Sequence, residues 1–318
     1  MNRDRLRGLL AIAVTSLLWG TTGTAATFAP EVGPLAIGAS ALGIGGLLQA
    51  LIALPALRSA RDALWRKRFV VIVGALAVAI YPLAFYSSMH FAGVAVGSVV
   101  SLASAPLASG VLERLVDKRP LGRWWLLAAA LGVVGSILLG VSKLAGPAES
   151  PAATGLGIVL GLVAGTTYAT YSWASHRLMA GGVGRAASMG AVFGGGGLVL
   201  MPVLVLTGGP LVTTWQNFAV GAYMALVPMF LGYLLFGYGL TKVSATTATT
   251  VTLTEPAVAT VLAVLIVGER LTPFGWSGLV VIAIMPVILA WAPSDSASVS
   301  NTQGLSPYSR NEPFLEFR

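Results

Sequence analysis

Residues 274–292 read FGWSGLVVIAIMPVILAWA, nineteen residues without a charged side chain. A helix needs about 20 consecutive apolar residues to cross the hydrocarbon core of a bilayer, and this stretch meets that requirement. Residues 122–142 read GRWWLLAAALGVVGSILLGVS and carry one charge, Arg123, near their start. Runs of this kind recur along the chain, and they predict an all-α membrane protein.

The composition of the whole chain agrees with this fold class. Its 318 residues are 56% hydrophobic and 9% charged, and the mean hydropathy is +0.85, whereas a soluble domain carries about 25% charged residues. A soluble enzyme is thereby excluded. A transmembrane β-barrel fits poorly, because its strands alternate apolar and polar residues over about 10 positions. With no Cys and 2 His, the chain offers no thiolate or His-rich metal site and no haem attachment, so we expect no cofactor and no metal.

Ten apolar segments follow one another with short connections, and no soluble domain fits between them. The first has a basic start, like a signal peptide, but its apolar run continues to Phe28 without a small-residue cleavage site. We therefore keep it in the mature fold. Residues 293–318 are rich in Ser, Asn and Pro and are predicted to be a disordered tail. The ten predicted helices are 8–27, 34–57, 69–91, 94–116, 122–142, 154–178, 185–206, 216–241, 246–268 and 274–292.

Lys and Arg are distributed unequally over the connections. If the N-terminus is inside and ten helices alternate, 17 basic residues fall inside, and only Lys143 and Arg270 fall outside. Short cytoplasmic loops are enriched in Lys and Arg, so this split predicts ten helices with both termini in the cytoplasm. It also accounts for the net charge of +8 without nucleic acid, because such loops meet anionic lipid.

The two halves of the chain carry weakly similar motifs in the same order. Each predicted repeat, 1–146 and 151–292, holds five helices, so the second repeat enters the membrane from the opposite side. Inverted repeats of this kind build secondary transporters that bind their substrate near the bilayer midplane. The matching motifs are Gly20-Thr21-Thr22 with Gly165-Thr166-Thr167, Pro106 with Pro256, and Pro120-Leu121-Gly122 with Pro273-Phe274-Gly275.

The second half also contains three motifs that belong together in a known family. They are Leu240-Thr241-Lys242-Val243, Thr254-Glu255-Pro256-Ala257 and Gly268-Glu269-Arg270-Leu271-Thr272. This set resembles the second EamA-type repeat of the drug/metabolite transporter superfamily, and Trp19-Gly20 is similar to its first helix. The first repeat departs from the pattern, since Ala105-Pro106 replaces Glu-Pro. Within the superfamily the chain most resembles YddG-type amino-acid exporters. That resemblance implies ten helices around a central cavity that opens alternately to each side.

Glu255 is the one acidic residue placed well inside a predicted membrane helix. A carboxylate at that depth costs several kcal/mol unless it is paired or protonated, and Pro256 next to it removes a backbone N–H. Two readings follow. Glu255 could couple transport to protons or anchor a substrate amine. Alternatively, a protonated Glu255 could bond the carbonyl that Pro256 leaves free.

Aromatic and hydroxyl side chains at membrane depth are expected to line the cavity. Tyr86 and His90 are four residues apart and share a helix face. His90 could contact a substrate carboxylate, or it could be a solvated residue beside an interfacial aromatic belt. Ser and Thr could bond a polar solute or their own helix. Together with Glu255, the predicted substrate-binding residues are Trp19, Tyr81, Tyr86, His90, Ser101, Tyr168, Tyr233 and Thr252.

The arrangement of the helices can be predicted from the same side chains. The first, third, fourth, sixth, eighth and ninth helices hold the polar and aromatic residues and should line the cavity, while the fifth and tenth should face outward. Gly157, Gly161 and Gly165, spaced by four, favour close packing against another helix. Irregular or kinked segments should border the cavity, because freed backbone groups are tolerated only near protein or water. We expect them at Pro82, Pro106, Pro228 and Pro256.

These observations favour a secondary transporter of a bacterial inner membrane that exports aromatic and other amino acids by alternating access. No Gly-x-x-x-x-Gly-Lys-Ser/Thr loop is present, so no ATP hydrolysis by this chain is expected, and we expect a monomer that needs no ATP-hydrolysing subunit. A multidrug or other metabolite exporter is the alternative within transport. A membrane-embedded enzyme or scaffold is the alternative outside it, but no catalytic pair of residues accompanies Glu255, and we expect no enzyme.

Overall fold

The structure, a computed structural model, describes residues 3–118, 120–142, 151–267 and 272–291. Every regular element in these ranges is helical, and nine helical spans there are long and apolar enough to cross a membrane. A shorter apolar helix covers Arg123–Leu139. The prediction of an all-α protein with ten membrane helices is therefore confirmed. The predicted tail 293–318, the motif at 268–271 and Lys143 lie outside the described residues.

The first half of the chain forms five spans, of which the second is irregular. The first span is α1 (Arg3–Ala26). The second combines α2 (Pro34–Gly38), the π-helical η1 (Ala39–Ile44) and α3 (Gly45–Ile52), and two short helices follow it, α4 (Leu54–Ser59) and α5 (Arg61–Arg66). The third and fourth spans form α6 (Arg68–Leu115), and the fifth is α7 (Arg123–Ser142).

The second half also forms five spans, and two of them are broken by short irregular turns. The sixth and seventh spans are α8 (Pro151–Ala180) and α9 (Arg185–Thr207), and η2 (Gly209–Val212) follows. The eighth combines α10 (Trp215–Met224), the π-helical η3 (Ala225–Leu231) and α11 (Gly232–Leu240). The ninth combines α12 (Ala245–Val251), the 3₁₀ turn η4 (Thr252–Thr254), α13 (Glu255–Leu262) and η5 (Ala263–Val267), and the tenth is α14 (Pro273–Trp291).

One glycine separates the third span from the fourth. Gly93 has a φ of +79°, and it is the one residue of α6 with a non-helical backbone. A left-handed φ of this kind favours glycine over other residues. The chain folds back at this point. As a result the two parts of α6 pack closely, and a Cβ on Gly97 would lie only 2.6 Å from the Met89 amide nitrogen. The predicted boundary between 69–91 and 94–116 is confirmed.

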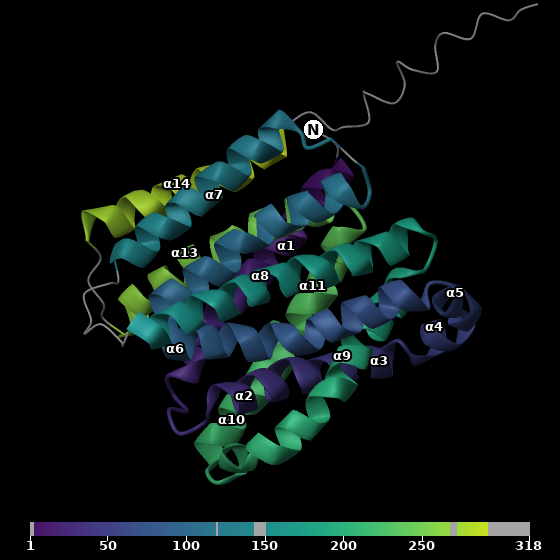
Figure 1. Cartoon of the computed structure of the whole chain (residues 1–318), viewed down its shortest axis with the longest axis horizontal. Helices are drawn as coiled ribbons and strands as arrows, with labels where there is room; N and C mark the ends of the chain where they lie inside the picture. The colour runs from purple at the N-terminus through teal and green to yellow at the C-terminus, as the bar shows by residue number, and fades with distance from the viewer. Residues whose placement is uncertain (1–2, 119, 143–150, 268–271, 292–318) are drawn as a thin grey trace, which may run out of the picture.

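A row of glycines brings α8 into close contact with α6. A Cβ on Gly157 would lie 2.5 Å from the Cβ of Ala92, and a Cβ on Gly165 would lie 2.0 Å from the Ser104 hydroxyl oxygen. Only glycine permits backbones to approach this closely. The predicted packing role of the row is confirmed, and α8 is thereby held against both parts of α6 (Figure 1).

Of the four prolines expected at irregular segments, Pro228 lies within one, the π-helical η3. Pro256 is the second residue of α13, which follows the 3₁₀ turn η4. At Pro82 and Pro106 the backbone of α6 keeps helical dihedral angles, so no irregular segment lies at either proline. A helix can carry an internal proline when neighbouring protein groups meet the freed carbonyl. The π-helical η1 holds no proline, so this irregular segment could not be found from prolines.

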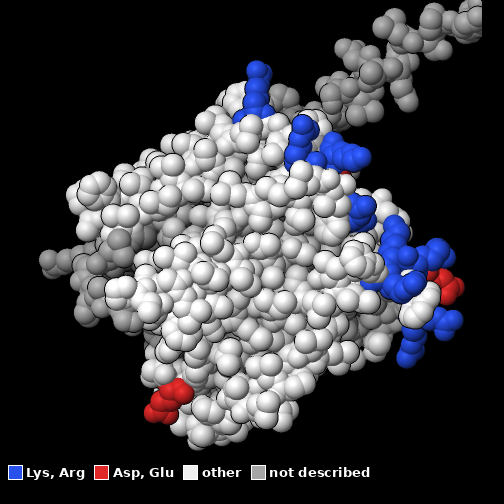
Figure 2. Space-filling view, in the orientation of Figure 1, with Lys and Arg blue, Asp and Glu red and all other residues white. Residues whose placement is uncertain are grey.

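The charged side chains lie mainly at one end of the molecule. Figure 2 shows Lys and Arg gathered there, at the end where α4 and α5 lie in Figure 1, while the rest of the visible face is almost uncharged. Large apolar side chains are exposed on the described surface, among them Phe69 at 75% and Trp291 at 83%. Such a surface suits contact with lipid. We call the end that carries Arg58, Arg61 and Arg66 the basic end.

Candidate functional site

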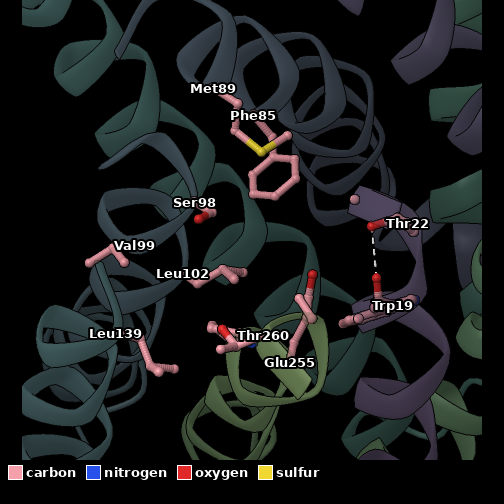
Figure 3. A pocket seen from close by; sticks show the side chains of 14 residues that line it. Trp19, Thr22, Phe85, Met89, Ser98, Val99, Leu102, Leu139, Glu255 and Thr260 are labelled. Carbon is pink, nitrogen blue, oxygen red and sulfur yellow. Dashed lines mark hydrogen bonds between the residues drawn. The ribbon is translucent and has the colours of Figure 1, made fainter. Parts of the chain in front are cut away.

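A cavity lies between the first span, both parts of α6, α7 and α13. Its volume is about 80 Å³, which is room for two or three waters at about 30 Å³ each. Figure 3 shows the side chains that line it, which include Trp19, Thr22, Phe85, Ser98, Glu255 and Thr260. Thr22 lies near the end of α1, which starts at the basic end, and Ser98 follows the Gly93 turn. The cavity therefore lies in the half of the molecule away from the basic end.

A second, smaller hollow adjoins this cavity and shares part of its wall. Both are lined by Trp19, Thr22, Phe85 and Glu255. The smaller hollow adds residues from η1, α6, η3 and α11. These added residues include Ala41, Leu42, Tyr81, Tyr86, Met229 and Tyr233. The two together form one candidate site between the first and second halves of the chain.

Glu255 faces this site with an unpaired carboxyl oxygen. The residue is 7% exposed, and its Oε2 atom is buried with no hydrogen-bond partner in the described part of the chain. Figure 3 shows the carboxyl pointing into the space that Phe85 and Ser98 also face. Buried polar groups are normally hydrogen-bonded, so this carboxyl oxygen has capacity for one more hydrogen bond.

The backbone beside Glu255 argues against a local structural role for its side chain. Pro256 has no N–H, so it cannot donate to the carbonyl of Thr252 four residues earlier. The amide of Glu255 itself donates to that carbonyl, because the chain tightens into the 3₁₀ turn η4. The carbonyl therefore needs no bond from the Glu255 carboxyl, and the reading in which Glu255 faces a solute is favoured.

Trp19 is fixed in the wall by a hydrogen bond to the irregular eighth span. Its Nε1 donates to the carbonyl oxygen of Pro228 at 2.9 Å, and the Thr15 hydroxyl on the same helix donates to the Gly232 carbonyl at 3.1 Å. The Trp19 ring lies 4.7 Å from the Tyr233 ring and 5.4 Å from the Phe236 ring, centroid to centroid. Trp19 thus joins the two halves of the chain and presents an aromatic surface to the cavity.

A layer of buried aromatic residues separates the cavity from the basic end. The Tyr168 hydroxyl lies 2.7 Å from the Thr252 hydroxyl oxygen, and the hydroxyls of Tyr171 and Tyr233 lie 2.6 Å apart. Each phenol in these pairs has the partner that a buried hydroxyl requires. Tyr168 and Thr252 bond each other and do not line the cavity. They belong to the aromatic layer beneath the cavity, together with Tyr171, Phe193 and Phe236.

Four predicted site residues line neither hollow: Tyr168 and Thr252, described above, and His90 and Ser101. His90 is exposed and its ring packs beside Phe91. The stripe of α6 that faces the cavity runs through Phe85 and Met89, and His90 is turned about 100° away from Met89 on the helix. Ser101 is 1% exposed, but its hydroxyl donates to the Gly97 carbonyl at 2.7 Å and it packs against α8. His90 and Ser101 therefore lie away from both hollows.

Several lining residues were missed from the sequence. Phe85 and Met89 continue the row that begins at Tyr81, at spacings of four, and this pattern could have found them. Leu139 lines the cavity from α7, so the fifth helix does not simply face outward as expected. The second span contributes Ala41 and Leu42, and small aliphatic residues carry no sequence signal for a site.

Polar contacts at the basic end join the first half of the chain to the second. Glu113 of α6 accepts hydrogen bonds from the Thr246 amide at 3.0 Å and from the Thr246 hydroxyl at 3.1 Å, so it caps α12. Asp117 accepts a hydrogen bond from Trp173 Nε1 at 2.9 Å and forms an ion pair with Arg177 of α8. These contacts thus join the two halves at the basic end, away from the cavity.

Membrane helices packed around a central polar and aromatic cavity define the class of membrane transporters. The EamA-like transporter family matches residues 6–141 and again residues 155–290. The chain belongs to this family, as its motifs predicted. The assignment to YddG-type exporters and the inverted relation of residues 1–146 to 151–292 stay predictions.

Two relatives and one solved structure are similar to the chain. YwfM of Bacillus subtilis, named an uncharacterized transporter, is 32% identical over 286 residues, covering 89% of this chain and 94% of YwfM. An uncharacterized transporter of Clostridium kluyveri is 34% identical over 161 residues, which is 48% of this chain and 50% of that protein. A crystal structure with 16% identity matches with a TM-score of 0.71 over 92% of this chain and 98% of that chain, and this match concerns the fold alone.

Proposed function

We propose that this protein exports amino acids with apolar or aromatic side chains across the bacterial inner membrane by alternating access. It would act as a monomer, with both termini in the cytoplasm and without an ATP-hydrolysing subunit. The observation that carries the proposal is the cavity between the two halves, where Trp19, Phe85 and Glu255 meet. Aromatic rings offer the surface that an apolar side chain requires, and the carboxyl offers a partner for an amino group. Export is the direction that the resemblance to YddG-type exporters implies.

The polarity of the cavity fits this class of substrate better than a phosphorylated one. A volume of about 80 Å³ admits an amino acid only after the helices around it separate further, as alternating access requires. A nucleotide sugar would need Lys or Arg for its phosphates, and neither is found among the described residues that line the cavity. A small apolar metabolite with an amine is therefore the preferred cargo.

Counterflow with purified protein in vesicles tests the proposal. Vesicles loaded with unlabelled phenylalanine should accumulate labelled phenylalanine, leucine and tryptophan, and should not accumulate labelled glutamate. If folded protein accumulates no amino acid above empty vesicles, the proposed function is wrong.

A pair of matched variants connects the activity to the cavity. Phe85→Ala removes a ring from the wall and enlarges the cavity. It should change the ranking of the transport rates of phenylalanine and leucine. Phe218→Ala removes a ring from α10 that is 48% exposed and lines neither hollow, so it should leave the ranking unchanged. Equal rankings in both variants would place the substrate elsewhere.

A further inference from the structure

The charge on the cavity wall differs from the charge on an amino acid. An amino acid carries an ammonium group and a carboxylate. Among the described residues that line the two hollows, Glu255 is the one ionisable acid, and no Lys, Arg or His is present. The cavity therefore has a counter-charge for the ammonium group and none for the carboxylate.

Glu255 is not paired by its protein neighbours. Its Oε2 atom has no hydrogen-bond partner among the described residues. The lining hydroxyl on α1 is already engaged, since Thr22 donates to the Trp19 carbonyl at 2.7 Å. An ionised carboxylate at membrane depth costs several kcal/mol unless it is paired. If Glu255 is ionised, its pairing cation must therefore come from the ligand.

The wall around Glu255 also suits a cation with an apolar body. Trp19 and Phe85 line both hollows with Glu255, and the faces of aromatic rings attract ammonium groups. We propose that the cavity recognises an ammonium group and an apolar body, and leaves the substrate carboxylate unrecognised, so that primary amines lacking a carboxylate are ligands. This inference rests on the proposed function and deepens it.

The same geometry links binding to a proton. In the empty cavity the unpaired Glu255 carboxyl holds its proton, because the neutral form avoids the cost of a buried charge. When a protonated amine binds, the carboxyl O–H bond breaks, the proton leaves to solvent, and a carboxylate–ammonium pair forms. Among the described residues, the other titratable groups that line the hollows are the phenols of Tyr81, Tyr86 and Tyr233. Tyr168 lies behind them, and these phenols supply no charge near neutral pH. One proton is therefore released for each amine bound.

Three compounds that differ only in their charged groups test the inference. They are phenylalanine, phenethylamine, which lacks the carboxylate, and 3-phenylpropionate, which lacks the amine. Neutral amines cross bilayers unaided, so binding is measured by calorimetry on purified protein. Phenethylamine should bind at least as tightly as phenylalanine, and 3-phenylpropionate should bind roughly 30-fold more weakly, because a buried charge then lacks its partner. Calorimetry in buffers of different ionisation enthalpy should show about one proton released per amine.

Variants at two acidic residues complete the experiment. Glu255→Gln should weaken phenethylamine binding by roughly 30-fold and abolish proton release. Glu31→Gln removes the same charge from the exposed connection after α1. It should change neither the affinity for phenethylamine nor the proton release. If 3-phenylpropionate binds as well as phenethylamine, or if Glu255→Gln binds phenethylamine at parental affinity, the inference is overturned. If phenylalanine is exchanged in vesicles but phenethylamine does not bind, the inference fails while the proposed function stands.

Discussion

Glu255 and Glu113 are the two buried carboxylates among the described residues, and their surroundings are opposite. Glu113 is 6% exposed and accepts two hydrogen bonds from Thr246 at the start of α12. Glu255 is 7% exposed and has an unpartnered oxygen in the cavity. A buried polar group contributes to stability when it is satisfied and costs stability when it is not. One acid thus stabilises the fold, and the other is available for a ligand.

Replacing each acid by leucine should separate these roles. Glu255→Leu should leave the melting temperature equal to or above that of the parent, because an unsatisfied carboxyl is removed. Glu113→Leu should lower the free energy of unfolding by about 1–3 kcal/mol, because the Thr246 amide is left unpaired. Thermal unfolding in detergent measures both. A melting temperature for Glu255→Leu that falls as far as that of Glu113→Leu would show that Glu255 has a structural role.

The residues of the site could be predicted from the sequence where chemistry marks them. Glu255 and Trp19 are rare types at membrane depth, and both reach the cavity. Ser101 and His90 carry equally polar groups, but helix rotation and the contact with α8 turn them elsewhere. Leu139 reaches the cavity without any chemical signal. The direction of a side chain depends on how the helices pack against each other, so it cannot be predicted from the sequence of one helix alone.

At the scale of elements, the contact between α6 and α8 depends on glycines at the point of closest approach. A Cβ on Gly165 would meet the Ser101 carbonyl oxygen at 2.5 Å and the Ser104 hydroxyl oxygen at 2.0 Å. At Gly155, one turn into the same helix, a Cβ would meet nothing within 4 Å. The chain therefore offers a substitution that should clash and a matched one that should not.

Valine at these two positions measures the importance of the contact. Gly165→Val should lower stability by about 1–3 kcal/mol or more, because overpacking forces the backbones apart. Gly155→Val should be close to neutral. The measurement is the fraction of monodisperse protein that survives heating in detergent. Equal survival of the two variants would mean that the α6–α8 contact is looser than described.

The elements themselves could be predicted because apolar length decides them. Ten segments of about 20 apolar residues gave ten helices, and Gly93 divides two of them where the sequence indicated. The short helices α4 and α5, the irregular segment η1 and the π-helical form of η3 were not predicted, although an irregular segment was expected at Pro228. Their formation depends on contacts with neighbouring spans, such as the bond from Trp19 to the Pro228 carbonyl, and not on local apolar content.

At the scale of the whole molecule, the basic end predicts how the protein sits in its membrane. The exposed Arg residues of α4 and α5 lie at that end, and positive charge favours the cytoplasmic face. A reporter that works only outside the cytoplasm should be active when it is fused after Gly209. A reporter that works only in the cytoplasm should be active when it is fused after Gly181. An inside signal after Gly209 would reverse or break the predicted topology.

The chain contains no cysteine, so a single introduced thiol reports on the cavity without background. Ser98→Cys places a thiol on the cavity wall, and Thr27→Cys places one on an exposed connection. In vesicles, phenylalanine at about ten times its Kd should slow the reaction of Ser98→Cys with a membrane-impermeant thiol reagent about tenfold, and should leave Thr27→Cys unaffected. If Ser98→Cys reacts at the same rate with and without phenylalanine, in protein that still exchanges phenylalanine, the cavity beside Glu255 is not the substrate site.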